Sequence, residues 1–359
     1  MNIFVNTLAY LVSTNYKHYP EINKDQSTQK IQLMDKNNFS KDILIIKDIE
    51  SEVNELAEKL KEDILIRLKR KGAVVGISGG IDSSVSLALV VRALGPDRVL
   101  GIMLPEKESN SDSLSLAKEL ADKFSVPYLV ENISGSLEGF RCYERRDEAI
   151  KRVFPEFDPK TFKSKIGINQ TGIEQKLPPV FSLTIIDPDG EAKNKVIPVK
   201  EFLQIVAASN FKQRSRMSML YYHAEVNHFV VIGTANKHEL VQGFFVKFGD
   251  GGSDIFPLSN YYKTQVYQMA GYLGIPQEII DRTPTTDTYS AEQTQQEFFY
   301  QLPFDQMDLL WYAFENGINK EVVAKEMGKT VEVIEIIFNN FARKHRTTEY
   351  LRSNPIHYI

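Results

Sequence analysis

One segment, Val74–Ser84, constrains the fold of this chain more than any other. It reads VVGISGGIDSS, an apolar run that ends in two glycines, and the apolar residues Val85–Leu94 follow at once. This order predicts a buried strand, a tight turn and then a helix. Two adjacent glycines let the backbone reach positive φ and approach a ligand closely. The N–H groups of the turn and of the first helical turn have no partners within the helix, so together they can bind phosphate.

The polar side chains of this segment fit a bound phosphate. Ser78, Ser83 and Ser84 offer hydroxyl donors. A carboxylate repels a bare phosphate, so we expect Asp82 to hold a divalent cation. The alternative is an ordinary glycine turn before a helix, and the full strand–loop–helix context argues against it. The sequence contains no G-x-x-x-x-G-K-[ST] motif, so a Walker-type NTPase is not supported.

Segments of strand length alternate with segments of helix length through much of the chain. The pattern predicts strands at residues 73–77, 99–104, 128–133 and 228–233. It predicts helices at residues 49–71, 83–94, 111–124, 214–226 and 262–273, and two or three more within 304–343. Such alternation is typical of a doubly wound parallel sheet flanked by helices. Ligands of these sheets bind at the carboxyl ends of the strands, where the glycine-rich loop falls.

The composition excludes several classes of protein. The 359 residues are 42% hydrophobic and 25% charged, as in an ordinary globular protein. A net charge of −4 argues against a nucleic-acid partner. The single cysteine, Cys142, excludes an internal disulfide and a cysteine-based zinc cluster. No segment reaches the roughly 18 apolar residues of a membrane span, and the first residues lack a signal-peptide pattern. We therefore expect a cytoplasmic protein that binds neither membrane nor nucleic acid.

A second region carries a more specific signal. Residues 231–239 read VIGTANKHE, and residues 243–258 read GFFVKFGDGGSDIFPL. Together with the SGGxDS loop, these residues closely resemble ammonia-dependent NAD synthetase, a family of the ATP pyrophosphatase superfamily. The resemblance covers about residues 43–143 and 209–346, and it implies the adenine nucleotide alpha hydrolase-like fold. It also implies the reaction of deamido-NAD, ATP and ammonia to give NAD, AMP and pyrophosphate.

This chemistry explains why the family needs ATP. A carboxylate is a poor acyl donor because its leaving group would be oxide, whereas an adenylated carboxylate releases AMP. Adenylation develops charge on the phosphates, which backbone donors, Mg²⁺ and lysine stabilise by electrostatics and positioning. The resemblance thus implies ATP as a substrate, Mg²⁺ as a cofactor, and deamido-NAD and ammonia as the other reactants.

The resemblance also implies a role for particular residues. ATP would be bound by the loop residues Gly76, Ile77, Ser78, Gly79, Gly80, Ile81, Asp82 and Ser83, and by Thr234, Lys263 and Thr285. Deamido-NAD would be bound by Arg214, Lys247 and Asp254. Asp82 and Glu239 would bind Mg²⁺, and the catalytic residues would be Asp82, Lys263 and Asp250, the last by ordering the loop near ammonia and the carboxylate. Taken singly, residues of these types are more often surface charges or caps, and only their joint spacing favours function.

Three departures from the family pattern leave the acceptor open. An insertion occupies residues 145–199, the C-terminal His-Lys pair is reversed as Lys344-His345, and Gln295-Gln296 replaces an acidic pair. The alternative within the class is an amidotransferase for another carboxylated metabolite, such as a carboxyl sugar. An RNA-modifying enzyme and a non-catalytic nucleotide sensor are alternatives from other classes. The acidic charge argues against the former, and the retained carboxylates and Lys263 argue against the latter.

We expect a polar N-terminal extension (1–41), a synthetase-like domain (42–303) that contains the insertion, and a helical C-terminal part (304–359). Residues 319–338 could also form a DNA-reading helix-turn-helix, although any small helical subdomain shows this pattern. No glutaminase domain is recognisable, so ammonia would arrive free or from a separate glutaminase partner. Family resemblance implies a homodimer.

The sequence of the insertion predicts a β-hairpin and contains no group of residues typical of a catalytic site. Its arms would be Val180–Ile186 and Val196–Val199 around the turn Asp187-Pro188-Asp189-Gly190, with Pro198 in an edge strand. A structural insertion, a substrate lid and an oligomer contact all remain open as its role.

Overall fold

A four-stranded parallel sheet organises the chain, with its strands in the order β3-β2-β1-β7. The computed structural model describes residues 39–168, 180–285, 289–291, 293–295 and 299–358, so most of the predicted N-terminal extension lies outside the described residues. The strands are β1 (Ala73–Gly76), β2 (Val99–Met103), β3 (Tyr128–Val130) and β7 (Val230–Ile232). Val75 of β1 pairs with Gly101 on one side and with Ile232 on the other. The predicted doubly wound parallel sheet is confirmed.

Helices cover both faces of this sheet, and neighbouring strand residues point to opposite faces. Val75 belongs to a core cluster with residues of α1, α2, α3 and α8, whereas Val74 packs with residues of α4 and α6. Because both faces of the sheet are covered, each strand residue packs against a helix on one face or the other. The strands therefore read as unbroken apolar runs. The bounds of these helices are α1 (Ile49–Glu62), α2 (Ile81–Leu94), α3 (Ser111–Lys123), α4 (Ser134–Gly139), α6 (Val199–Asn227) and α8 (Lys263–Leu273).

Several predicted bounds were too long or too short. The helix predicted to reach residue 71 ends as a π-helical turn at Asp63–Arg67, and the helix predicted at 214–226 is the second half of α6. Short elements complete this part of the chain: the 3-10 helices Lys41–Leu44 and Pro96–Arg98, and the helices α7 (Lys237–Gln242) and α9 (Gln277–Asp281). Among the described residues, no helix is both long and apolar enough to cross a membrane.

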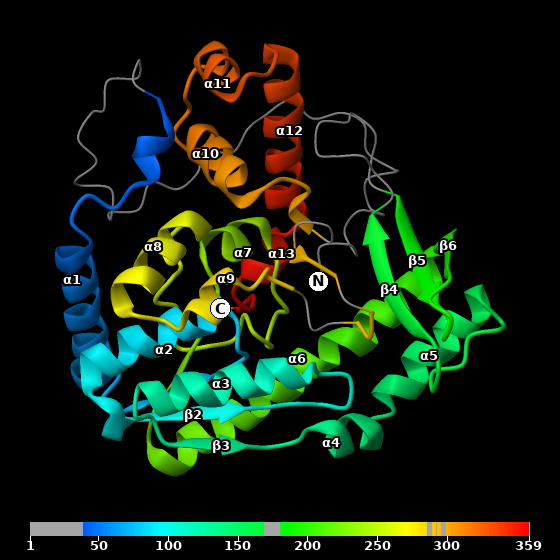
Figure 1. The fold of residues 1–359 in the computed structure, drawn as a ribbon, viewed down its shortest axis with the longest axis horizontal. Coiled ribbons are helices and arrows are strands. Elements are labelled where there is room, and N and C mark those ends of the chain that lie inside the picture. Colours follow the sequence, from blue (N-terminus) through cyan, green and yellow to red (C-terminus); the bar gives the residue numbers. More distant parts are fainter. Residues whose placement is uncertain (1–38, 169–179, 286–288, 292, 296–298, 359) are drawn as a thin grey trace.

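The insertion forms a helix and a separate antiparallel sheet. These are α5 (Cys142–Val153), β4 (Lys163–Ile168), β5 (Phe181–Ile186) and β6 (Ala192–Val196), with the strands in the order β4-β5-β6. The sheet lies away from the parallel sheet, on the right of Figure 1. Strand β4 was not predicted, because its inward residue Ser164 is buried but polar and breaks the apolar pattern.

The predicted hairpin is confirmed in its first arm and its turn, but its second arm was misplaced. Asp187 Oδ1 accepts hydrogen bonds from the N–H groups of Asp189 and Glu191, so the chain reverses at once and β6 begins at Ala192. Pro198 is not in a strand. It is the N-cap of α6, where the absence of an N–H group costs nothing because the first helical N–H groups lack partners.

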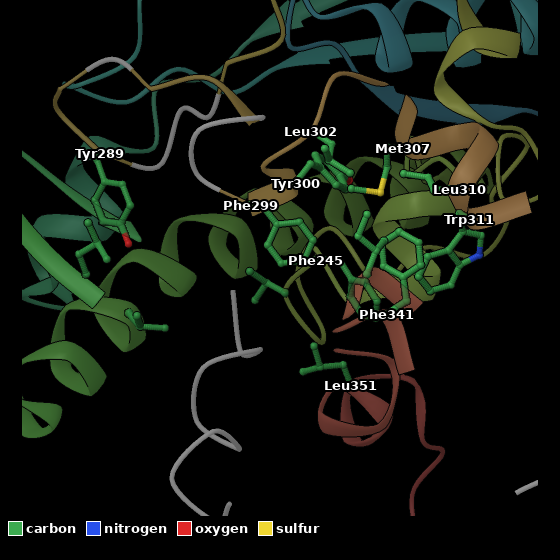
Figure 2. Close-up of a cluster of buried hydrophobic side chains, with 14 of the residues drawn as sticks. Phe245, Tyr289, Phe299, Tyr300, Leu302, Met307, Leu310, Trp311, Phe341 and Leu351 are labelled. Atoms are coloured by element: carbon green, nitrogen blue, oxygen red, sulfur yellow. The ribbon is translucent and has the colours of Figure 1, made fainter. Parts of the chain in front are cut away.

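Four C-terminal helices form the part drawn in orange and red in Figure 1, namely α10 (Phe304–Glu315), α11 (Lys320–Met327), α12 (Val331–Thr347) and α13 (Glu349–Arg352). Figure 2 shows the aromatic centre of their core, where the rings of Trp311 and Phe341 lie 4.8 Å apart. The same contiguous cluster includes Ile166 and Leu183 of the insertion. The C-terminal helices and the insertion therefore share a core, and the proposed domain bounds at residues 41, 145, 199 and 304 stay predictions.

Candidate active site

A cavity of about 330 Å³ opens where β1, β2 and β7 end. The strand order reverses at β1, and such a reversal is where doubly wound sheets bind ligands. The size fits a small-molecule site. The sequence-predicted residues that line it are Gly76, Ile77, Ser78, Gly80, Ile81, Asp82, Ser83, Thr234, Glu239, Asp250 and Thr285.

The glycine-rich loop is folded by its own hydroxyl groups. Ser78 Oγ and Ser83 Oγ lie 3.0 Å apart, and Ser83 Oγ donates to the carbonyl oxygen of Gly80 over 2.9 Å. Ser84 Oγ donates to the same carbonyl oxygen over 2.9 Å and is fully buried, so this serine does not offer its hydroxyl to the cavity as we expected. The loop is therefore held in shape before any ligand binds.

Gly79 does not line the cavity but sets the path of the loop. Its φ is +75°, and a Cβ atom there would lie 2.4 Å from the carbonyl oxygen of Ser113. The next residue, Gly80, is the N-cap of α2 and has no side chain to cap it. The N–H groups of the first turn of this 14-residue helix therefore face the cavity as potential anion ligands.

Asp82 and Glu239 meet through Asn236. The Asn236 side chain donates a hydrogen bond of 3.1 Å to Asp82 Oδ1, and its backbone N–H donates one of 3.0 Å to Glu239 Oε2. Asn236 Oδ1 accepts from the N–H of Glu239, which completes a capping box at the start of α7. Lys263 Nζ forms an ion pair with Asp82 Oδ2.

The electrostatics of this group favour an added cation. Burial, and then the charge of Asp82, raise the pKa of Glu239 to about 8. Lys263 is completely buried, and burial opposes its charge, but the two carboxylates outweigh burial and raise its pKa. A divalent cation would stabilise both carboxylates in their charged forms.

The two carboxylates fit Mg²⁺ that is shared with a nucleotide. In the part of the chain that the structure describes, no group of three or more His, Cys, Asp or Glu could hold a metal ion. Mg²⁺ often binds through one or two carboxylates together with substrate phosphates and water, so two carboxylates would be enough protein ligands. Lys263 does not line the cavity, and it contacts the site only through its ion pair with Asp82.

Asp250 secures a neighbouring part of the cavity wall. Its Oδ1 accepts a hydrogen bond of 2.7 Å from the N–H of Val246, which also lines the cavity. Burial raises the pKa of Asp250. The carboxyl group thus closes the loop of residues 246–250, in agreement with an ordering role, although its catalytic part stays a prediction.

The three residues predicted to bind deamido-NAD do not line the cavity. Arg214 Nε donates to the carbonyl oxygen of Lys247 over 3.2 Å, and Lys247 Nζ donates to two carbonyl oxygens near the C-terminus. Asp254 accepts hydrogen bonds from the N–H of Val231 and from the hydroxyl of Tyr221. The structure therefore groups the predicted ATP residues and places these three elsewhere.

Sequence reasoning missed two arginines of the cavity. Arg216 lines it and donates to the carbonyl oxygen of Leu104 over 3.2 Å, and Arg282 lines it and donates to Ser113 Oγ over 2.9 Å. Residues two apart lie on different faces of a helix, so Arg214 and Arg216 cannot both face the same side. Arg282 directly precedes Thr283-Pro284-Thr285, whose last residue was predicted to bind ATP, and this position could have identified it as a residue of the site.

The reversed C-terminal pair also lies outside the cavity lining. Lys344 Nζ donates to the carbonyl oxygen of Phe299 over 2.9 Å, and burial lowers the pKa of Lys344 to about 7. His345 Nδ1 lies 2.9 Å from the carbonyl oxygen of Val241.

Comparisons with known proteins point to one family. The sequence model of the NAD synthase family matches residues 45–156 and 175–355. The chain is 43% identical over 317 residues to an NH(3)-dependent NAD(+) synthetase from Rhizobium meliloti, a match that spans 88% of this chain and 94% of the relative. It is 32% identical over 299 residues to an enzyme of the same name from Thermotoga neapolitana, spanning 83% and 93%. The unmatched residues 157–174 lie within the predicted insertion.

Two solved structures share the fold. An NMN synthetase from Francisella tularensis aligns with a TM-score of 0.58 at 22% identity, over 86% of this chain and 98% of that one. An NH3-dependent NAD synthetase from Campylobacter jejuni aligns with a TM-score of 0.56 at 20% identity, over 87% and 99%.

Proposed function

The chain belongs to the NAD synthase family, and from this membership we propose that it converts deamido-NAD, ATP and ammonia into NAD, AMP and pyrophosphate. The observation that carries the proposal is the meeting of Asp82, Glu239 and Lys263 beside the glycine-rich loop. Relatives that bear this activity in their names match most of the chain at 40–43% identity. No observation favours an amidotransferase for another carboxylated metabolite.

The first step joins the acceptor carboxylate to AMP. A carboxylate oxygen of deamido-NAD attacks the α-phosphorus of ATP, and the bond to the bridging oxygen breaks, so pyrophosphate leaves. The start of α2, which lines the cavity, would present backbone N–H groups to the departing phosphates. Asp82 and Glu239 would hold Mg²⁺, which neutralises phosphate charge when bound. Lys263 keeps Asp82 oriented.

The second step replaces AMP with ammonia. The nitrogen attacks the activated carbonyl carbon, AMP leaves with the electron pair of its bond to that carbon, and the nitrogen loses a proton to give the amide. Asp250 supports this step by fixing residues 246–250 at the cavity wall. Thr234 and Thr285, which both line the cavity, would contact ATP.

The proposal includes parts that rest on the family alone. Arg214, Lys247 and Asp254 would bind deamido-NAD, although none of them lines the cavity. The enzyme would be a cytoplasmic homodimer that uses free ammonia or ammonia from a separate glutaminase. Light scattering of the purified protein tests the dimer.

Pyrophosphate release tests the function directly. The protein is mixed with ATP, Mg²⁺ and ammonium, with deamido-NAD, with other carboxylated metabolites or with no acceptor. We expect release and NAD formation only with deamido-NAD, and neither with Asp82→Ala. ATP binding without turnover of deamido-NAD would leave the nucleotide site intact and overturn the acceptor assignment.

A further inference from the structure

The outer edge of strand β4 holds a segment that leads to the cavity. The N–H of Ser164 donates a hydrogen bond of 2.9 Å to Ser290 Oγ, and the N–H of Ala291 donates one of 3.2 Å to the carbonyl oxygen of Ser164. The other edge of β4 pairs with β5, where Ser164 lies opposite Ile185. Residues 290 and 291 therefore occupy the free edge that a strand otherwise presents to solvent.

The neighbouring Tyr289 strengthens this attachment. It is buried in the cluster that contains Ile166 and Leu183 of the insertion. Figure 2 shows its ring beside the green elements of the insertion, apart from the aromatic residues of the C-terminal helices.

The same part of the chain forms the cavity wall a few residues away. Thr283, Pro284, Thr285 and Gln295 line the cavity. Thr285 forms an antiparallel bridge with Thr294, and the N–H of Gln295 donates to the carbonyl oxygen of Pro284 over 3.0 Å. The paired residues 283–285 and 293–295 thus present one end to the cavity, and the described residues between them, 289–291, are bound to β4.

A second contact reaches another segment of the cavity wall, residues 104–110. Arg146 Nη1 donates a charged hydrogen bond of 2.6 Å to Glu108 Oε2, and the Arg146 side chain is only 5% exposed. Glu108 immediately precedes Ser109 and Asn110, which line the cavity. Lys212 Nζ binds both Glu106 and Glu108, over 3.0 and 2.7 Å, and ties this loop to α6 as well.

We propose that the insertion positions two segments of the wall of the ATP site. Strand β4 holds the paired residues 283–285 and 293–295 through Ser290, and Arg146 holds residues 104–110 through Glu108. None of the described residues within 145–199 lines the cavity, so the insertion acts through these segments and not by touching the ligand. Strand β4 lies in residues 157–174, which the family model does not match. The inference rests on the proposed function for the identity of the ligand.

Substitutions of Ser290 test the positioning role. Ser290→Ala removes the acceptor for the Ser164 N–H, whereas Ser290→Thr keeps a hydroxyl. Thr184→Ala is the matched control, because Thr184 Oγ1 accepts a hydrogen bond from Asn194 within the same sheet. For each purified protein, calorimetry gives the Kd for ATP, steady-state assays give KM and kcat, and a thermal melt gives Tm.

We expect Ser290→Ala to raise the Kd and KM for ATP about three- to tenfold, the usual effect of one lost hydrogen bond, with kcat and Tm nearly unchanged. Ser290→Thr should restore the wild-type values and Thr184→Ala should match them. Unchanged ATP binding in Ser290→Ala, or equal weakening in Thr184→Ala, would overturn the inference. If the wild-type protein forms no NAD, the proposed function fails, and the Kd for ATP still decides the positioning role.

Discussion

The amide of Asn236 donates a hydrogen bond of 3.1 Å to Asp82, which lies 154 positions earlier in the chain. Asn236 also caps α7 and binds Glu239 in both directions through the capping box. One buried side chain therefore joins both proposed Mg²⁺ ligands to the end of β7. The same Asn236 side chain caps the helix and binds Asp82. Its effects on stability and on activity can therefore be distinguished only by comparison with the loss of another helix cap.

Asn236→Ala should damage the site more than it damages the fold. Loss of an asparagine N-cap costs about 1 kcal/mol of stability, and this substitution also frees the Asp82 carboxylate. We expect kcat/KM for ATP to fall at least about tenfold, as for a lost partner of a metal ligand. Asn319→Ala is the control, because Asn319 is also a helix N-cap and accepts a hydrogen bond from the N–H of Glu321 at the exposed start of α11. Equal activity of the two variants in the pyrophosphate assay would contradict this reading.

Asp82→Asn should abolish pyrophosphate release while the protein stays folded at 25 °C. The substitution removes a proposed metal ligand and leaves Lys263 buried without its partner, which costs about 3–5 kcal/mol. We expect activity to fall by at least about a hundredfold, because phosphate charge is no longer neutralised. Asp97→Asn, in the 3-10 helix Pro96–Arg98 that follows α2, changes an exposed carboxylate and should leave activity and Tm unchanged. Substantial residual activity of Asp82→Asn would exclude Asp82 as a metal ligand.

Alanine substitutions at two glycines of similar φ distinguish the effect of backbone strain from the effect of displacing the glycine-rich loop. Gly79 and Gly95 have φ of +75° and +81°, so alanine at either costs on the order of 1–3 kcal/mol. A Cβ at Gly79 would also strike Ser113, whereas one at Gly95 meets nothing within 4 Å. Urea unfolding should show both variants destabilised, and kinetics should show a higher KM for ATP only in Gly79→Ala. An unchanged KM in Gly79→Ala would mean that the loop tolerates displacement.

Acid stability should depend on Arg146. Arg146 and Lys212 overcome the effect of burial and lower the pKa of Glu108 from 4.5 to about 2. A lowered carboxyl pKa contributes stability above pH 4.5 that is lost as the pH falls from 4.5 toward 2, on the order of 3 kcal/mol in total. Arg146→Gln raises the pKa of Glu108, so its acid-unfolding midpoint should move to higher pH.

Arg141→Gln is the control for this measurement. Arg141 and its partner Glu144 are 58% and 53% exposed, and an exposed ion pair adds little stability. Its acid-unfolding midpoint, followed by far-UV circular dichroism, should match that of the wild-type protein. Equal midpoints for Arg146→Gln and the wild-type protein would show that Lys212 alone keeps Glu108 charged.

The sequence alone determined those structural elements that depend only on residues close together in the chain. The strand–loop–helix unit around Gly79 and Gly80, the turn closed by Asp187 and the alternation of strands and helices were all predicted from residues close together in the chain. Apolar periodicity and turn chemistry depend on local backbone geometry, so they can be read without knowledge of the fold. The family resemblance added the names of the site residues but no contacts between them.

Only the tertiary structure decided which side chains share the cavity. Arg216 lines it and Arg214 does not, although the two are only two residues apart in the same motif, because the rotation of α6 depends on its packing against the sheet. Strand β4 and its contact with Ser290 left no apolar pattern, since backbone groups of a buried serine make that contact. The hydrogen bond between Asn236 and Asp82 could not be predicted from the sequence either. It depends on strand order and helix placement, which follow from the packing of the whole core.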